Sequence, residues 1–596
     1  MISPDLRARV DAWIADDPDE RDRDELRALL ADGSPAAGAE LADRFGGRLE
    51  FGTAGLRGAV AAGPNRMNRA VVRGATAALA GWLHARHRAT AGADGTAGTA
   101  QLPGTARTAG TAQTAGTAQT GAEGWASVAI GCDARHRSDE FADEAALVLA
   151  GAGLRVHLLP PRQPTPLLAF AVRHLSAAAG VMITASHNPP ADNGYKLYLA
   201  DGAQIVPPAD AEIEAAIRAL GPLAQVPVAD PGSPLIIRHG DEVAGAYLDA
   251  VAAPFRAPTG APGLRFVYTP LHGVAAGLAL RAFEQAGFPA PEVVAAQAAP
   301  DPDFPTVAFP NPEEPGALDL ALARARESGA DLVVANDPDG DRLAVAVPDP
   351  LAAGGWRTLT GDQLGALLGA YILERTSAAP DPGHRLVATT VVSGTLLASI
   401  AASAGASYAE TLTGFKWIVR AGDRRRDLRF TFGYEEALGY TIGRAVRDKD
   451  GIGAALAALS LAARARAGGE SLLDAYDTLE EAHGVHLTGQ LTSRTSAPLA
   501  IMARLRATPP TAFGGAAVTS IADLAGGTPE LPPADVLSYR LAGARVVIRP
   551  SGTEPKIKAY LEVVEPVSGG RLEEARRAAR GRMGPLREAV QAILAG

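Results

Sequence analysis

The chain has 596 residues, of which 47% are hydrophobic and 20% are charged, and its formal net charge at pH 7 is −10. This composition is typical of a soluble protein of about four domains at roughly 150 residues each, and no apolar run reaches the roughly 18 residues that a membrane-spanning helix needs. The negative net charge argues against non-specific nucleic-acid binding, and the single cysteine, Cys132, excludes an internal disulfide framework and favours a cytoplasmic location.

The N-terminal part of the chain predicts helices and one insertion. Residues 1–30 are charged throughout and lack the apolar stretch of a signal peptide, so we expect an exposed helix there. A helical stretch follows at about 67–88, and a Gly/Thr/Ala repeat occupies residues 91–123. Because this repeat has almost no large apolar side chain, it cannot bury a core and predicts a disordered surface insertion.

Further along, apolar β-rich runs alternate with Ala- and Leu-rich helical runs. This alternation predicts βαβ units, parallel or mixed sheets and therefore an α/β fold. Breaks rich in Pro and Gly indicate four segments, which we place at 1–207, 208–350, 351–485 and 486–596. The last segment has two strand-like runs around a tight loop, and a helical tail follows them.

Four unusual loops each follow a strand-like run, which is where ligands bind in open α/β sheets. The first reads TASHNPP at residues 184–190 and places Ser186 beside His187. A serine hydroxyl needs an adjacent base or a charge-stabilised product to act as a nucleophile. No Gly-x-Ser-x-Gly pattern surrounds Ser186, which argues against an α/β-hydrolase. A Ser/Asn turn with structural caps is the alternative.

The second loop carries three carboxylates at alternate positions, Asp337, Asp339 and Asp341, with Gly340 among them. Such carboxylates can converge on one hard cation. An EF-hand loop would need its glycine at position six and a glutamate at position twelve, but position twelve here is Pro348. The pattern favours Mg²⁺ shared with a phosphate, and a solvated acidic turn is the alternative.

The third region contains Glu435 and Glu436, which follow another strand-like run. Paired carboxylates and backbone amides suit sugar hydroxyls, whereas an exposed acidic helix start is the alternative. Lys449, between Asp448 and Asp450, is suited to exchange a proton with a hydroxyl if its pKa is tuned. It would otherwise form an exposed ion pair.

The fourth loop reads RPSGT at residues 549–553. One guanidinium fork, two hydroxyls and a glycine turn of backbone amides make an anion-binding nest, although the P-loop pattern is absent. Lys556 and Lys558 add positive charge nearby.

Lysine is rare in this chain, since it accounts for only five of the 56 basic residues. An ammonium group can release a proton where a guanidinium cannot, so these lysines are candidates for special roles. All five lie in or beside the four loop regions. Lys196 is in NGYKLY, just after the first loop, Lys416 is in TLTGFKWI, which begins the third region, Lys449 is in the third region as well, and Lys556 and Lys558 follow the fourth loop.

Taken together, the motifs resemble those of the α-D-phosphohexomutase superfamily, which includes phosphoglucomutases and phosphomannomutases. The resemblance runs from FGTAGLRG at 51–58 to RPSGTEPK at 549–556 and keeps the order of the superfamily's motifs. It is strongest for the glucose-1-phosphate branch and its longer phosphopentomutase-like members. It implies three similar βα domains and a smaller mixed C-terminal domain around a central cleft.

The resemblance also implies roles for the four segments: phosphoserine domain, metal-binding domain, sugar-binding domain and C-terminal phosphate-binding domain, in chain order. Ser186 would carry the phosphoryl group, and it would ligate one Mg²⁺ per chain together with Asp337, Asp339 and Asp341. The candidates for the general acid and base are His187, Lys196 and Lys449. The residues implied in substrate binding are Thr53, Arg57, Arg342, Thr413, Gly414, Glu435, Ala437, Arg549, Ser551, Gly552 and Thr553.

The resulting hypothesis is a mutase that interconverts α-D-glucose 1-phosphate and glucose 6-phosphate, with glucose 1,6-bisphosphate as intermediate and activator. Ala437 stands where many phosphoglucomutases have serine, which leaves phosphomannomutase and phosphopentomutase as alternatives. The expected partner is a small phosphosugar, with neither nucleic acid nor membrane involved. A non-catalytic phosphosugar-binding protein and a serine hydrolase are the hypotheses from other classes.

Overall fold

The computed structural model describes residues 2–50, 55–93, 126–257, 263–378, 381–423, 425–551 and 555–595. From residue 94 onward, the predicted insertion at 91–123 lies outside these residues. The chain forms two compact units. The first comprises Met1–Tyr247 and Pro300–Phe309, and the second comprises Leu248–Ala299 and Pro310–Gly596.

The first unit is built on a six-stranded sheet with the strand order β1-β5-β4-β2-β3-β6. β2 pairs in parallel with β3 and β4, and β3 pairs in parallel with β6. β5 pairs antiparallel with both of its neighbours, so the sheet is mixed. The strands are β1 (Leu56–Ala59), β2 (Ser127–Cys132), β3 (Arg155–Leu158), β4 (Ala179–Ile183), β5 (Asp192–Leu199) and β6 (Ile236–Arg238).

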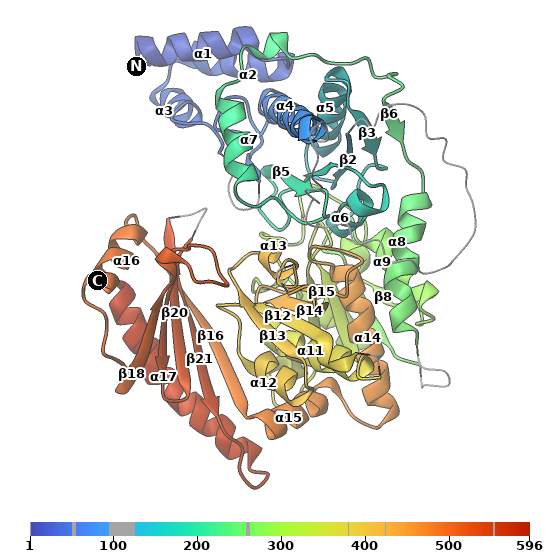
Figure 1. The fold of residues 1–596 in the computed structure, drawn as a ribbon, viewed down its shortest axis with the longest axis vertical. Helices are drawn as coiled ribbons and strands as arrows, with labels where there is room; N and C mark the ends of the chain where they lie inside the picture. Colours follow the sequence, from blue (N-terminus) through green and yellow to red (C-terminus); the bar gives the residue numbers. More distant parts are fainter. Residues whose placement is uncertain are drawn as a thin grey trace. The chain divides into compact units, whose positions relative to one another are not determined.

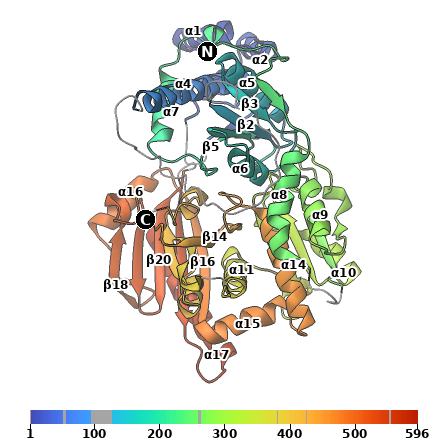
Figure 2. The same cartoon turned by 45° about the vertical axis from the view of Figure 1, so that its right-hand side comes forward.

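Helices cover both faces of this sheet (Figure 1, Figure 2). Phe141 of α5 packs with Ile130 and Val181 in the main core, which α4 and α7 also join. α6 packs on the other face, where a Cβ on Gly180 would lie 2.3 Å from Val172, so only glycine permits this approach. The helices are α4 (Arg69–Ala93), α5 (Ser138–Gly151), α6 (Thr165–His174) and α7 (Ala209–Arg218).

The N-terminal residues form three helices: α1 (Pro4–Asp16), α2 (Glu20–Asp32) and α3 (Pro35–Arg44). The expectation of a single exposed helix over residues 1–30 is therefore wrong. Leu6 and Val10 are spaced for one helix face, and Val10 and Leu26 are 0% exposed within a small core shared by the three helices.

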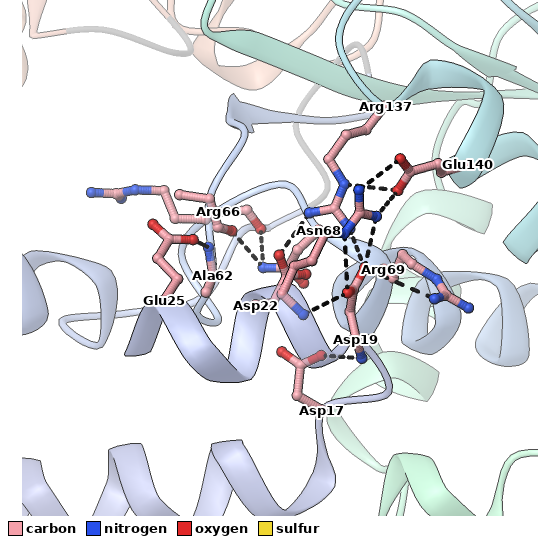
Figure 3. A network of polar contacts seen from close by, with 12 residues as sticks. Asp17, Asp19, Asp22, Glu25, Ala62, Arg66, Asn68, Arg69, Arg137 and Glu140 are labelled. Carbon is pink, nitrogen blue, oxygen red and sulfur yellow. Dashed lines mark hydrogen bonds and ion pairs between the residues drawn. The ribbon is translucent and has the colours of Figure 1, made fainter. Parts of the chain in front are cut away.

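A polar network anchors α2 to the start of α5 (Figure 3). Asp19 is the N-cap of α2 and accepts a hydrogen bond from the backbone of Arg21 at 3.0 Å. Arg137 forms ion pairs with both Asp19 and Asp22, and its Nη1 lies 2.7 Å from Asp22 Oδ1. The N-terminal end of α2 is thus tied to the start of α5 by charge.

The second unit contains three sheets with the strand orders β11-β10-β9-β7-β8, β13-β12-β14-β15 and β16-β21-β20-β19-β18-β17. The first two are mixed, whereas every pairing in the third is antiparallel. The strands of the first two are β7 (Phe266–Thr269), β8 (Glu292–Val293), β9 (Leu332–Asn336), β10 (Leu343–Pro348), β11 (Trp356–Thr358), β12 (Arg385–Thr390), β13 (Ser407–Thr411), β14 (Arg429–Glu435) and β15 (Gly439–Ile442).

The third sheet, called here the C-terminal sheet, contains β16 (Val485–Arg494), β17 (Ala512–Phe513), β18 (Ala516–Asp523), β19 (Leu537–Leu541), β20 (Ala544–Pro550) and β21 (Lys556–Glu565). Successive residues of β20 point to opposite faces. Ile548 packs into the core beneath α17, whereas Val547 packs against Val391 and Leu412, which follow β12 and β13. Both faces of the C-terminal sheet are therefore covered.

The helices of the second unit pack around these sheets, and α8 spans the boundary between the two units. They are α8 (Glu242–Ala252), α9 (Ala276–Gln285), α10 (Asp319–Ser328), α11 (Gly361–Arg375), α12 (Leu396–Ser403), α13 (Phe415–Ile418), α14 (Gly451–Ala467), α15 (Leu472–His483), α16 (Pro498–Ala507) and α17 (Leu572–Ala595). Within the described residues, none of the helices has both the length and the apolar character needed to cross a bilayer.

Candidate functional site

Ser186 lies on the loop after β4, three residues beyond the end of the strand. Its φ of 53° is in the left-handed region, which few residues other than glycine adopt, and such strained positions cluster at functional sites. Its backbone N–H donates to Thr184 Oγ1 at 2.8 Å. Ser186 is 3% exposed, and its Oγ lies 3.2 Å from Nδ1 of His187. The structure therefore places an imidazole within hydrogen-bonding distance of the serine oxygen.

Arg135 fixes the shape of this loop. Its guanidinium donates to four carbonyl oxygens, those of Ser186 at 2.5 Å, Asn188 at 2.6 Å, Pro189 at 2.8 Å and Asp192 at 3.0 Å. Its Nε lies 3.4 Å from Asp133, and the ring of Phe304 lies 5.1 Å from its Cζ. Sequence reasoning missed Arg135, because nothing in the segment after β2 distinguishes it from a surface arginine.

The strands beside the loop carry two further predicted residues. Arg57 on β1 donates to Asn188 Oδ1 at 2.9 Å and so contacts the loop of Ser186 directly. Lys196 is buried on β5, where it pairs with Met182 of β4. Thr53, which was predicted to bind substrate, lies outside the described residues.

The three aspartates of the second loop come together after β9. Asp337, Asp339 and Asp341 are all 0% exposed, and one carboxylate oxygen from each lies within 4.8 Å of the others. Burial, together with the negative charges of Asp341 and Asp339, raises the pKa of Asp337 well above its usual range. A divalent cation would relieve this repulsion, so the donor set fits a hard metal ion. The alternative of a solvated acidic turn is wrong.

Arg342 links the acidic loop to the sugar loop, the name used here for residues 435–438. Its backbone N–H donates to Asp337 Oδ1 at 2.9 Å, and its Nη1 donates to the carbonyl oxygen of Ala437 at 2.8 Å. Its Nε lies 3.9 Å from Asp341 Oδ1. Arg342 therefore holds the acidic loop, predicted to bind metal, and the sugar loop, predicted to bind substrate, at a fixed spacing.

Lys449 adjoins the acidic loop as well. It is 8% exposed, and its Nζ lies 3.2 Å from Asp341 Oδ2. Burial alone would lower the pKa of Lys449, but the charges of Asp341 and Asp448 raise it above the usual range. A Cβ on Gly439 would lie 2.4 Å from the Lys449 side chain, so glycine leaves room for this lysine. The ion pair is thus buried, and the exposed alternative is wrong.

The predicted sugar-binding residues lie near the ends of β13 and β14. Glu435 ends β14 and is 7% exposed, which excludes an exposed helix start. Thr413 Oγ1 is buried and has no hydrogen-bond partner among the described residues. A ligand hydroxyl would satisfy this oxygen. Gly414, with a φ of 112°, is the residue that precedes α13.

Glu436 faces a cavity of about 440 Å³ within the second unit. Its carboxylate accepts hydrogen bonds from the hydroxyls of Thr390 and Ser393, each at 3.3 Å. Burial and the neighbouring charge of Glu435 raise the pKa of Glu436 to about 7. The described residues that line the cavity include four more carboxylates and neither lysine nor arginine, so its chemistry differs from that of a phosphate site.

Replacing Glu436 with glutamine is expected to stabilise the protein at alkaline pH. A carboxyl whose pKa is raised on folding contributes full stability below its unfolded pKa and loses it as pH rises through about 7. Since glutamine stays neutral, the variant should gain about 2 kcal/mol in free energy of unfolding at about pH 8.5 and little at about pH 5. Urea unfolding measures both values. Glu314→Gln, an exposed carboxyl on the same cavity, is the control and should show no such pH dependence.

The fourth loop concentrates positive charge at the end of β20. Arg549 pairs with Lys558 of β21, and the N–H of Ser551 donates to the carbonyl oxygen of Lys556 at 2.9 Å. Burial, Lys556 and, more weakly, Arg549 lower the pKa of Lys558. This crowding of cations fits an anion such as phosphate. Gly552 and Thr553 lie outside the described residues.

The structure divides the predicted residues between the two units. Ser186, which is expected to carry the transferred group, belongs to the first unit together with His187, Arg57 and Lys196. The second unit brings together the acidic loop, the sugar loop, Lys449 and the residues around Arg549. The predicted association of Ser186 with the metal ligands therefore stays a prediction.

Comparison with known proteins matches four consecutive parts of the chain to one set of family models. Residues 86–222 match phosphoglucomutase/phosphomannomutase α/β/α domain I, and residues 245–353 match domain II. Residues 360–481 match domain III, and residues 502–579 match the C-terminal domain.

Several proteins are similar over most of the chain. The probable phosphomannomutase of Haemophilus influenzae is 43% identical over 73% of this chain and 88% of its own length. The phosphopentomutase of Homo sapiens is 32% identical, with coverage of 95% and 92%. The phosphoglucomutase of Staphylococcus aureus is 32% identical, with coverage of 89% and 92%. A solved family protein from Burkholderia thailandensis, 20% identical, has the same fold with a TM-score of 0.65 over 91% of this chain and 97% of that one.

Proposed function

Since this chain belongs to the phosphoglucomutase/phosphomannomutase family, whose members are phosphotransferase mutases, we propose that it interconverts α-D-glucose 1-phosphate and glucose 6-phosphate through a phosphorylated Ser186. The family match bears out the predicted superfamily and its four-domain α/β fold. The geometry around Ser186 is the observation that carries the proposed mechanism, because a strained, buried serine beside an imidazole suits a phosphoryl carrier.

The proposed reaction has two transfers. In the first, a sugar hydroxyl oxygen attacks the phosphorus on Ser186, so the sugar O–P bond forms while the bond to Ser186 Oγ breaks. The hydroxyl proton passes to a base, for which Lys196 is the candidate, because the raised pKa of Lys449 keeps that lysine protonated and suits it to act as an acid. His187 is placed to donate a proton to Ser186 Oγ. The intermediate is glucose 1,6-bisphosphate, which would also act as activator. In the second transfer, its other phosphoryl group returns to Ser186.

The acidic loop would hold the metal ion of this reaction. We infer that Asp337, Asp339 and Asp341 bind one Mg²⁺ together with the phosphate of Ser186, because buried carboxylates of mutually raised pKa suit a hard cation. When bound, the ion neutralises negative charge on the transferring group. Arg342 would hold the acidic loop and the sugar loop at a fixed distance during both transfers, through its hydrogen bonds to Asp337 and Ala437.

Substrate recognition is assigned to three groups of residues. Arg549 and Ser551, with Gly552 and Thr553, would hold the phosphate that is not transferred, because positive charge is concentrated there. Glu435 and Thr413 would bind sugar hydroxyls, and the buried, unsatisfied hydroxyl oxygen of Thr413 supports this role. Arg57 would line the transfer site through its contact with the loop of Ser186.

Phosphomannomutase and then phosphopentomutase are the alternative functions, and Ala437 is the residue that keeps both open. A methyl group offers no hydrogen bond to a sugar hydroxyl, so a contact that many phosphoglucomutases make is absent. The human phosphopentomutase, similar over 95% of this chain, is consistent with the phosphopentomutase alternative. The probable phosphomannomutase of Haemophilus influenzae is consistent with the phosphomannomutase alternative.

Turnover of three sugar 1-phosphates tests the proposal. With Mg²⁺ and glucose 1,6-bisphosphate, we expect kcat/KM for glucose 1-phosphate to exceed the values for mannose and ribose 1-phosphates by about tenfold or more. Phosphorus NMR follows each conversion directly. A higher value for ribose 1-phosphate would make the chain a phosphopentomutase, and turnover of none of the three would contradict a mutase altogether.

A further inference from the structure

A buried polar cluster around Arg545 lies where the C-terminal sheet meets the segments that follow β12 and β13. Arg545 is 6% exposed and stands on β20, four residues before Arg549. Because side chains alternate along a strand, Arg545, Val547 and Arg549 share one face. On that face, Val547 packs with Val391 and Leu412. Arg549, which would bind phosphate, thus lies on the same face as Arg545.

The Arg545 guanidinium is held by both sides of this contact. Nη1 lies 3.0 Å from Glu410 Oε1 and donates to the carbonyl oxygen of Val391 at 3.3 Å. Nη2 lies 3.2 Å from Glu562 Oε2 and also donates to the carbonyl oxygen of Ser393. Charge-assisted hydrogen bonds of this kind fix geometry as well as adding energy.

Glu562 extends the cluster toward α12. Its Oε1 accepts hydrogen bonds from the backbone N–H of Thr395 at 2.6 Å and from the Thr395 hydroxyl at 2.8 Å. The Nδ1 of His486 lies 3.0 Å from the same oxygen. Glu562 and His486 are 3% and 8% exposed, so these contacts are shielded from solvent.

The segment after β12, residues 391–395, also contacts the sugar loop. Ser393 Oγ donates to Glu436 at 3.3 Å, while the carbonyl oxygen of the same residue accepts from Arg545. The next N–H, that of Gly394, donates to Asp362 at 2.7 Å. One short segment is therefore hydrogen-bonded to the sugar loop on one side and to the C-terminal sheet on the other.

We propose that Arg545 is a positioning residue that fixes the spacing between the sugar loop and the phosphate-binding residues, and so selects phosphosugars by their length. The proposal rests on the proposed function, because it assumes that Glu435 contacts a sugar whose phosphate is held by Arg549. Hexose and pentose phosphates differ in the separation of the phosphate from the hydroxyl that accepts the second group. A sugar phosphate makes its contacts with both sites at once only when its length matches their spacing, so a fixed spacing discriminates between them by affinity.

Arg545→Met tests this role, with Arg540→Met as the matched control. Arg540 is the residue opposite Arg545 on β19 and is exposed. For Arg545→Met, we expect KM for the preferred sugar phosphate to rise about tenfold, with kcat changed less than about threefold. The ratio of kcat/KM between glucose 1-phosphate and ribose 1-phosphate should also move at least about fivefold toward unity. Arg540→Met should match the wild type in all three.

Thr395→Val provides a second test that leaves both charges in place, and it is decisive if Arg545→Met fails to fold. It removes the hydroxyl contact with Glu562 and should move KM and the selectivity ratio in the same direction. Unchanged KM and selectivity in folded variants would overturn the proposal, as would a fall in kcat alone. If the wild type turns over none of the sugars, the proposed function fails. Calorimetry then measures the Kd values for glucose 6-phosphate and ribose 5-phosphate. The positioning role requires that the ratio of these two Kd values move at least about fivefold toward unity in the variants.

Discussion

Replacing Ser186 with alanine is expected to lower kcat by about 10⁴-fold or more, because the phosphoryl group then has no oxygen on which to be carried. The fold should survive, since alanine keeps the backbone contacts that Arg135 makes with the loop. The melting temperature should stay within a few degrees of the wild type. Phosphorus NMR measures the turnover, and intact mass spectrometry should show that roughly 80 Da of covalent phosphate is lost with the hydroxyl.

Ser176→Ala is the matched control for this substitution. Ser176 has the same φ of 53° but is exposed, so any effect of alanine on a left-handed backbone appears in both variants. Only the Ser186 variant should lose activity. Normal turnover by Ser186→Ala would refute the serine as carrier, whatever the family resemblance.

Replacing Asp339 with asparagine is expected to have opposite effects on activity and on stability. One of three crowded carboxylates is removed, so the metal-free protein should gain about 1 kcal/mol in free energy of unfolding. The metal site loses a charged ligand, so kcat should fall by about 10³-fold. The stabilisation that Mg²⁺ gives to the wild type, which follows from its affinity for the folded state, should disappear.

Melting curves with and without Mg²⁺, together with the turnover assay, measure both effects. Asp381→Asn is the control, because Asp381 is an exposed aspartate of the same unit. It should leave the curves and the turnover unchanged. If Asp339→Asn kept its response to Mg²⁺, the acidic loop could not be the metal site. Chelation with EDTA should likewise remove wild-type activity, and added Mg²⁺ should restore it.

The acidic loop could be predicted from sequence because its pattern is local. Three aspartates at alternate positions after an apolar strand predict carboxylates that converge, and Asp337, Asp339 and Asp341 are buried and close together as that prediction requires. Sequence could not decide how far Glu435 and Lys449 were exposed. Their burial depends on segments distant in the chain, such as the one that carries Asp341.

The positioning arginines were beyond the reach of sequence reasoning. Arg135 and Arg545 are buried, and each donates hydrogen bonds to the carbonyl oxygens of a loop. All but five of the 56 basic residues are arginine, so an arginine in this sequence attracts no attention. In such a chain, a structural arginine has the same signature as a solvated one. In the N-terminal helices the error has the opposite sign. Their many charged residues predicted an exposed helix, although Leu6 and Val10 form a buried apolar face.

The path of the chain between the two units has a practical consequence. Residues 300–309 belong to the first unit, although the residues before and after them belong to the second. A fragment cut at Tyr247 would therefore lack Phe304, whose ring lies against the guanidinium of Arg135. The first unit is thus not one continuous segment of the chain. A fragment that contains Ser186 and keeps this contact must also include residues 300–309, joined to it by a linker.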